Sequence, residues 1–169
     1  ESNKIYYYDE DYGGNFEVMM DWEDPLMSSS AAYICQNGGD ILEIGFGMGI
    51  SAGYIQSHSI NSHTIIENHP EIILKAQAWA SGKSNVTIIT GSWYDVKDSL
   101  STYDGVFYDT FGDNNMIHFS SSLSSLVVVP KTKPLIFCGS GAFVAKLTPI
   151  TTRIQNKNIQ PQKYNQLRS

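Results

Sequence analysis

The sequence has few cysteines, few basic residues and no long apolar segment, and each shortage excludes a class of protein. Only two of the 169 residues are cysteines, Cys35 and Cys138, which is too few for a disulfide framework. No apolar run approaches the length that a bilayer requires, and the first residues lack the basic and apolar segments of a signal peptide. We therefore expect a soluble, cytoplasmic protein without a membrane partner.

Acidic residues outnumber basic ones, with 17 Asp and Glu against 11 Lys and Arg, and the formal net charge is −6. Nucleic-acid binding draws affinity from Lys and Arg side chains that neutralise phosphates, so this balance argues against a nucleic-acid partner. An acidic surface instead suits small cationic substrates. The hydrophobic content of 41% is enough for a single core, and no second domain is needed.

The chain is organised around a short run of strand-forming residues, 41–44, that leads into a glycine-rich turn. Gly45, Gly47 and Gly49 allow a tight turn and a close approach of the backbone to a ligand, because glycine lacks Cβ. A helix is predicted from Ile50 to Gln56 and a second buried strand from His63 to Glu67. Glu67 lies 22 positions after Gly45, where a doubly wound fold delivers a carboxylate to a pair of ribose hydroxyls.

Strand-like and helical segments alternate along the rest of the chain, which predicts an α/β fold: a Rossmann-like, doubly wound, mostly parallel sheet. Residues 1–15 are expected to be a flexible arm, and residues 148–169 a polar tail. Two helical pieces are expected from Phe16 to Tyr33, separated at Pro25, with Asp24 as the cap of the second. Further strands are predicted at 85–90, 103–110 and 135–138, and further helices at 70–80 and 116–126.

The predicted strand ends define a candidate site, because ligands of such sheets bind beyond the carboxyl ends of the strands. These ends supply the glycine turn, Glu67, the Ser92-Trp93 pair and Asp109. Trp93 is either a rim aromatic packed on the next helix or a platform for adenine. Asp109 either caps the following turn or projects into the cleft, and we favour the cleft.

Two cofactor classes fit this layout, dinucleotides and S-adenosylmethionine, since both place an acid on a ribose. Ile50 stands where the dinucleotide fingerprint requires Gly or Ala. Glu43, two residues before the first glycine, suits S-adenosylmethionine loops, although a salt bridge at the strand end would explain it equally.

Several motifs resemble guanidinoacetate N-methyltransferases and the related arginine δ-N-methyltransferases. The most specific are the loop from Gly45 to Ile50, the segment from Trp22 to Met27 and the strand end from Tyr108 to Phe111. The resemblance covers roughly residues 16–145 and implies a class I methyltransferase with S-adenosylmethionine as cofactor. We expect the methyltransferase domain to span residues 16–147 and to hold no metal. It also implies that Glu23 and Asp109 grip the guanidinium of the acceptor. The cofactor-binding residues are then, together with Gly45 of the turn, Met19, Met27, Phe46, Gly47, Met48, Gly49, Ile50, Ser51, Glu67, Asn68, His69, Ser92 and Trp93.

Two carboxylates suit a guanidino acceptor on physical grounds. A guanidinium is planar, and each carboxylate can accept a pair of its N–H groups, which fixes one nitrogen in line with the methyl donor. Because its pKa is above about 12, the group is a poor nucleophile unless negative charge activates it and accepts its proton. We expect Asp109 to accept the proton, with Glu23 as the second ligand of the guanidinium. The alternatives are a cofactor-binding module without turnover, a different small-molecule acceptor and, more remotely, a dinucleotide oxidoreductase.

The sequence also departs from the guanidinoacetate enzymes. Gly141-Ala142-Phe143 replaces a Ser-Trp step that meets the substrate carboxylate, and this turn is closer to that of the arginine enzymes. The acceptor therefore stays open between a small guanidino compound and an arginine. The C-terminal part is shortened, so the strand at 135–138 is expected at a sheet edge, where either one short tail strand or a second subunit in a homodimer covers it.

Overall fold

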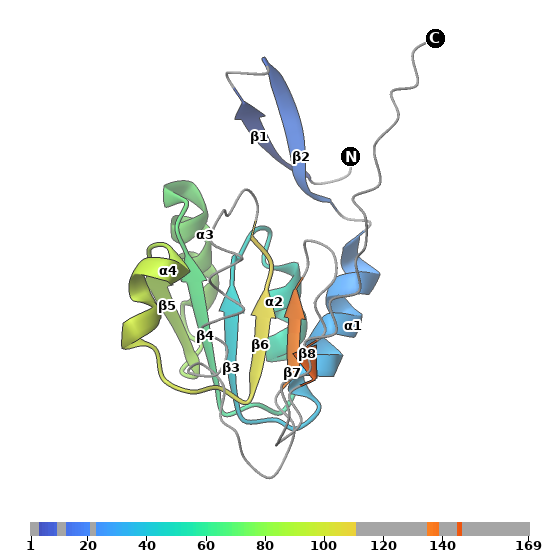
Figure 1. Ribbon diagram of the computed structural model, residues 1–169, viewed down its shortest axis with the longest axis vertical. Helices are drawn as coiled ribbons and strands as arrows, with labels where there is room; N and C mark the ends of the chain where they lie inside the picture. Colours follow the sequence, from blue (N-terminus) through green and yellow to red (C-terminus); the bar gives the residue numbers. More distant parts are fainter. Residues whose placement is uncertain (1–3, 10–12, 21–22, 111–134, 139–144, 147–169) are drawn as a thin grey trace.

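The computed structural model describes residues 4–9, 13–20, 23–110, 135–138 and 145–146 (Figure 1). The elements, in chain order, are the strands β1 (Lys4–Asp9) and β2 (Gly14–Met20), helix α1 (Asp24–Cys35), strand β3 (Asp40–Ile44), helix α2 (Ile50–Gln56), strand β4 (Ser62–Glu67), helix α3 (Pro70–Ala80), strand β5 (Val86–Thr90), helix α4 (Trp93–Val96), the 3₁₀ helix η2 (Lys97–Ser99), and strands β6 (Gly105–Tyr108), β7 (Leu135–Cys138) and β8 (Ala145–Lys146). The structure confirms the predicted helices α2 and α3 and the predicted strands β3, β4, β5, β6 and β7, with β6 shorter than expected. The helix predicted at 116–126 lies outside the described residues.

The main sheet has the strand order β5-β4-β3-β6-β7-β8. β5, β4, β3, β6 and β7 are parallel, and β8 pairs antiparallel with β7. The chain moves outward from β3 to β5 and then crosses back to the other side of β3, so the strand order reverses between β3 and β6. In open sheets of this kind the ligand crevice lies outside the carboxyl ends of the strands at that reversal.

Both faces of the sheet are buried, which is why β3 and β6 are nearly uninterrupted apolar runs. On one face, α1 and α2 pack on Ile41 and Phe107, and α2 and α3 pack on Ile65. On the other face, Leu42 and Ile44 pack against Trp93 and its neighbours. Because side chains alternate along a strand, each strand contributes to both layers of the core.

The N-terminal segment corrects one prediction. Residues 16–20 are not helical; β2 pairs antiparallel with β1, and Figure 1 shows this hairpin beyond the carboxyl ends of the main sheet. Phe16, Met19 and Met20 have helical spacing, but the pairing with a strand rich in tyrosine overrides it. A register shift between Ile5 and Tyr6 also interrupts the strand alternation, which hides the hairpin in the sequence.

Helix α1 begins one residue earlier than predicted. Glu23 occupies the N-cap position and Asp24 is the first helical residue, with Pro25 in the first turn as expected. Asp24 instead accepts a hydrogen bond of 2.7 Å from the hydroxyl of Tyr54, which ties α1 to α2. β8 provides the short strand expected on the edge of β7, one of the two alternatives from the sequence. Among the described residues, none of the helices has the length and apolar character needed to span a membrane.

Substitution of Gly105 should destabilise the fold, because this residue at the start of β6 lies against the end of α1. A Cβ on Gly105 would lie 2.4 Å from the carbonyl oxygen of Ile34. We expect Gly105→Ala to lower the free energy of unfolding by roughly 1–3 kcal/mol in urea titrations. Gly53→Ala in α2, where a Cβ meets nothing within 4 Å, is the matched control and should be neutral or slightly stabilising. Equal effects of the two substitutions would contradict this account.

Candidate active site

The glycine loop lies at the point where the strand order reverses. Gly45, Gly47 and Gly49 all have positive φ, and Gly49 precedes the first residue of α2. A Cβ on Gly45 would lie 2.1 Å from the carbonyl oxygen of Asp109, and one on Gly49 would lie 2.6 Å from the Phe46 ring. The loop can therefore be this tight only with glycine at both positions, as the sequence predicted.

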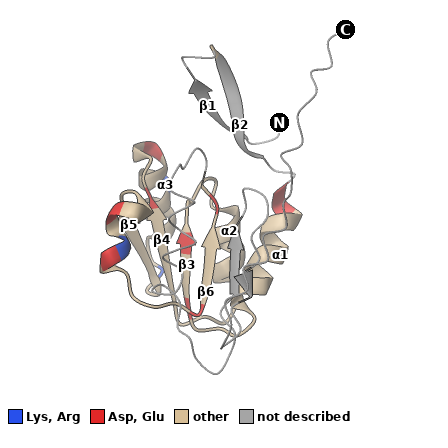
Figure 2. Cartoon of the chain, in the orientation of Figure 1, with Lys and Arg blue, Asp and Glu red and all other residues tan. Residues whose placement is uncertain are grey.

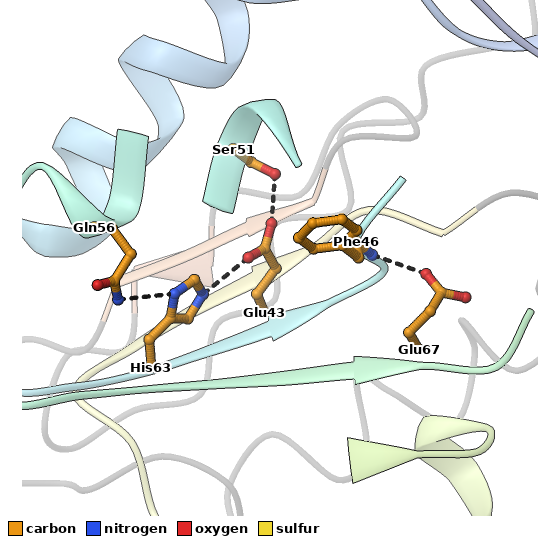
Figure 3. A network of polar contacts seen from close by, with 6 residues as sticks. All are labelled: Glu43, Phe46, Ser51, Gln56, His63 and Glu67. Atoms are coloured by element: carbon orange, nitrogen blue, oxygen red, sulfur yellow. Dashed lines mark hydrogen bonds and ion pairs between the residues drawn. The ribbon is translucent and has the colours of Figure 1, made fainter. Parts of the chain in front are cut away.

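Glu67 connects the glycine loop to the loop after β4. Its carboxylate accepts a backbone N–H bond from Phe46 at 2.9 Å (Figure 3). It also accepts backbone N–H bonds from Asn68 at 2.8 Å and from His69 at 2.8 Å. The residue is 7% exposed. A carboxylate offers about four acceptor positions, so three are occupied and one is left for a ligand hydroxyl. Glu67 thus organises the two loops, in addition to the ribose contact predicted for it.

Asp109 and Glu23 converge on the same end of the sheet, from the end of β6 and the N-cap of α1. Burial, followed by the negative charges of Glu23 and Glu43, raises the pKa of Asp109 from 3.8 to about 6. The backbone N–H of Asp109 donates to the Ile44 carbonyl at 3.0 Å, which extends the pairing of β3 with β6 into the site. Figure 2 shows acidic segments at this end of the sheet and at the start of α1.

Trp93 and Met27 lie deeper than the resemblance implied. Trp93 is 2% exposed and packs edge-on against Tyr108, with ring centroids 5.9 Å apart. Met27 is 1% exposed within α1. The Trp93 ring is therefore not a rim aromatic: it supports the crevice from the core. A cofactor contact by either residue remains a prediction.

The other predicted cofactor residues are distributed around the loop. Phe46 is buried against Trp79, while the Asn68 and His69 side chains are exposed at the start of α3. Ser92 caps α4 by accepting a hydrogen bond from Tyr94 N at 3.3 Å. Gly47, Met48, Ile50 and Ser51 continue the loop into α2, where Met48 and Ile50 pack against the core cluster of α1 and α2. Met19 lies in β2 opposite Ile5, and its side chain is outside the described part of the structure.

Sequence reasoning missed a buried polar network beneath the loop (Figure 3). Glu43 accepts a hydrogen bond from the Ser51 hydroxyl and contacts His63, whose Nε2 lies 2.8 Å from a Glu43 oxygen. Both Glu43 and His63 are fully buried. Glu43 thus has a buried polar partner in His63, at the position where a salt bridge was one of the two interpretations from the sequence. His63 carried no signal in the sequence, because its partner lies 20 residues away and is reached only through the register of β3 with β4.

Thr110 is a second residue that the sequence analysis did not single out. Its hydroxyl is buried beside the glycine loop and has no hydrogen-bond partner within the described ranges. Such a group can be satisfied by a ligand. Over the same ranges, no three His, Cys, Asp or Glu side chains are grouped so as to hold a metal ion.

Asp109→Asn should stabilise the fold in a pH-dependent way. The pKa of Asp109 rises on folding from 3.8 to about 6, so folding favours the protonated carboxyl group. The folded state is therefore not penalised below about pH 4, where the group is protonated in both states, and it loses stability as the pH rises through about 6 and the carboxyl group ionises. At pH 7.5 the variant should therefore gain on the order of 2 kcal/mol in free energy of unfolding, and the gain should shrink toward pH 4. Urea titrations across this range measure the difference.

Asp98→Asn is the control for this prediction, because the Asp98 side chain is 89% exposed. It should show no comparable dependence on pH. A difference between wild type and Asp109→Asn that stays constant from pH 4 to 7.5 would contradict the raised pKa.

Comparison with known proteins identifies related sequences. The profile of the family described as guanidinoacetate N-methyltransferase matches residues 13–124. Protein arginine N-methyltransferase 2 of Yarrowia lipolytica is 38% identical over 112 residues, covering 59% of this chain and 23% of the relative. The protein of the same name from Eremothecium gossypii is 35% identical over 138 residues, covering 75% of this chain and 32% of the relative. The chain thus spans about a quarter to a third of the length of these relatives.

The fold also matches solved structures. The plantazolicin methyltransferase BamL, in complex with a triazolic desmethylPZN analog and SAH, aligns with a TM-score of 0.53 at 18% identity, covering 69% of this chain and 44% of that one. At this identity the likeness concerns the fold alone. The strand order and the match together give a class I, Rossmann-like methyltransferase fold, as predicted.

Proposed function

Because the chain belongs to the guanidinoacetate N-methyltransferase family, we propose that it transfers a methyl group from S-adenosylmethionine to a guanidino nitrogen, and that the acceptor is an arginine. The observation that carries the proposal is the pair of acids Glu23 and Asp109 at the strand reversal, with the pKa of Asp109 raised by burial and by the charge of Glu23. The preference for arginine over a small guanidino compound rests on the names of the curated relatives.

The described residues fit the cofactor. The glycine loop leaves the backbone open to close approach, and Glu67 keeps one acceptor position for a ribose hydroxyl. Gly45 to Ser51, Glu67 to His69, Ser92, Trp93, Met19 and Met27 are proposed to hold it. When bound, S-adenosylmethionine supplies a methyl group on a positively charged sulfur.

Glu23 and Asp109 are proposed to bind and activate the guanidinium. A guanidinium offers paired N–H donors, and two carboxylates from different elements hold it in one plane. One nitrogen loses a proton as its new bond to carbon forms, and Asp109 accepts that proton. A carboxylate whose pKa is near 6 is ionised at neutral pH and is a stronger base than an ordinary aspartate.

The second candidate is a cofactor-binding module without turnover, which the same loop and Glu67 would serve. An acceptor that is a small guanidino molecule is the third. The turn from Gly141 to Phe143, which bears on the acceptor, lies outside the described residues. The cytoplasmic location, the homodimer, the division at residues 15 and 147, and the absence of nucleic-acid and membrane partners stay predictions from the sequence.

S-Adenosylhomocysteine should stabilise the protein, whereas NAD should not. A ligand that binds only the folded state stabilises it by about 2.7 kcal/mol when present at 100 times its Kd. We therefore expect the melting temperature, measured by differential scanning fluorimetry, to rise by several degrees with S-adenosylhomocysteine. A rise with NAD alone would refute the cofactor assignment.

Asp109→Asn should nearly abolish methylation while leaving the cofactor bound. The substitution keeps the shape of the side chain but removes the charge that orients and deprotonates the acceptor, so kcat/KM should fall by roughly 10² or more. The assay uses labelled S-adenosylmethionine with an arginine-containing peptide and with guanidinoacetate, and calorimetry with S-adenosylhomocysteine checks the cofactor. Asp98→Asn is the control and should retain wild-type activity.

The outcomes separate the candidates. If wild type methylates neither acceptor but binds the cofactor, the protein is the cofactor-binding module without turnover. If only guanidinoacetate is methylated, the acceptor is the small molecule. Transfer that survives in both Asp109→Asn and Glu23→Gln would show that these acids do not grip the acceptor.

A further inference from the structure

Apart from Ser51, which is proposed to hold the cofactor, the buried network beneath the glycine loop has no role in the proposed reaction, yet it contains two ionisable groups at full burial. Glu43 lies in the central strand, two residues before Gly45. Its carboxylate has two partners, the Ser51 hydroxyl and His63 Nε2. A buried carboxylate is costly unless donors replace water, and the two contacts supply such donors.

Gln56 sets the protonation pattern of His63. The Gln56 amide nitrogen lies 3.3 Å from His63 Nδ1, and an amide nitrogen can only donate. Nδ1 is then the acceptor, and Nε2 carries the proton that is donated to Glu43. The edge of the His63 ring against Trp79, with centroids 6.3 Å apart, holds the ring in place.

The network holds α2 at both ends. Ser51 lies in the first turn of the helix, directly after the glycine loop, and Gln56 is its last residue. Through Glu43 and His63, these two residues are fixed to β3 and β4 (Figure 3). The position of the loop therefore depends on the pair at the centre of the network.

The charge of Glu43 reaches other elements. From β6, the pKa of Asp109 is raised first by burial and then by Glu23 and Glu43. From α1, burial and the charge of Glu43 raise the pKa of the Cys35 thiol to about 12. The α2 partners are neutral, and on α3 the neighbour is Trp79, with the Lys83 amine 4.3 Å from the centroid of the Trp79 ring.

We propose that His63 is a positioning residue for methyl transfer: it keeps Glu43 ionised and oriented, so that Glu43 fixes the start of α2 and its charge acts on Asp109. The consequence for the reaction rests on the proposed function of Asp109. The physical link from His63 through Glu43 to Asp109 does not, and it can be measured without turnover.

The test is the titration of the Asp109 carboxyl carbon, followed by NMR in the full chain. In wild type the midpoint should be about 6. Glu43→Gln removes a like charge and should lower it by roughly half a pH unit. His63→Leu leaves the buried Glu43 with one donor, so Glu43 takes up a proton and the midpoint should fall by the same amount. The double variant should fall no further, because both changes remove one charge.

A conservative replacement of His63 distinguishes a role in positioning Glu43 from a role in packing alone. His63→Gln keeps an N–H donor for Glu43 and should return the midpoint close to that of wild type. If His63→Leu does not fold, His63→Asn serves in its place, since its shorter amide leaves Glu43 without the second donor, and the same fall is expected. Ala78→Ser, on the exposed side of α3, is the control and should leave the midpoint unchanged.

A wild-type midpoint in folded His63→Leu or His63→Asn, alongside a lower midpoint in Glu43→Gln, would overturn the proposal and leave His63 a packing residue. An unchanged midpoint in Glu43→Gln would overturn it too. In the methylation assay, the acidic limb of kcat/KM should move to lower pH in His63→Leu, as the titration does. If wild type shows no methylation, the proposed function fails, while the NMR titrations still decide the role of His63.

Discussion

The structure depends on how negative charge is compensated at the carboxyl edge of one parallel sheet. Glu43, Glu67 and Asp109 lie within one residue of the ends of β3, β4 and β6, three neighbouring strands. Glu67 receives three backbone N–H bonds, and Glu43 receives the Ser51 hydroxyl and the His63 ring. The described residues provide no hydrogen bond to the Asp109 carboxylate, and its pKa rises to about 6. Removing a charge from water without donors is costly, and among these three acids the cost falls on Asp109, which is partly buried.

The two compensated acids shape the crevice. Glu67 draws the glycine loop toward the start of α3, and Glu43 draws the start of α2 toward the central strand. These bonds are stronger than they would be in water because both carboxylates are buried. The loop conformation is therefore determined by carboxylates beneath and beside it, as well as by its glycines.

The uncompensated acid is where we place the reaction. A site that holds a partly buried carboxylate without a hydrogen-bond donor from the described residues gives up stability, and such strain is common where a protein must bind a ligand of opposite charge. In the proposed reaction, the guanidinium would provide donors that the described residues do not. The hydrophobic residues behind the site, including Trp93 and Met27, hold the acids apart from bulk water.

The sequence by itself determined the strand, glycine turn and helix around Gly45, the later α and β segments and the position of Glu67 at a strand end. These features are local: a short apolar run suits a buried strand, and positive φ at close approach requires glycine. Only the tertiary structure decided that residues 14–20 pair as a strand, that Trp93 and Met27 face the core, that His63 meets Glu43 and that the pKa of Asp109 is raised. Each of these depends on the distance between residues far apart in the chain and on the burial of their side chains, which no local pattern contains.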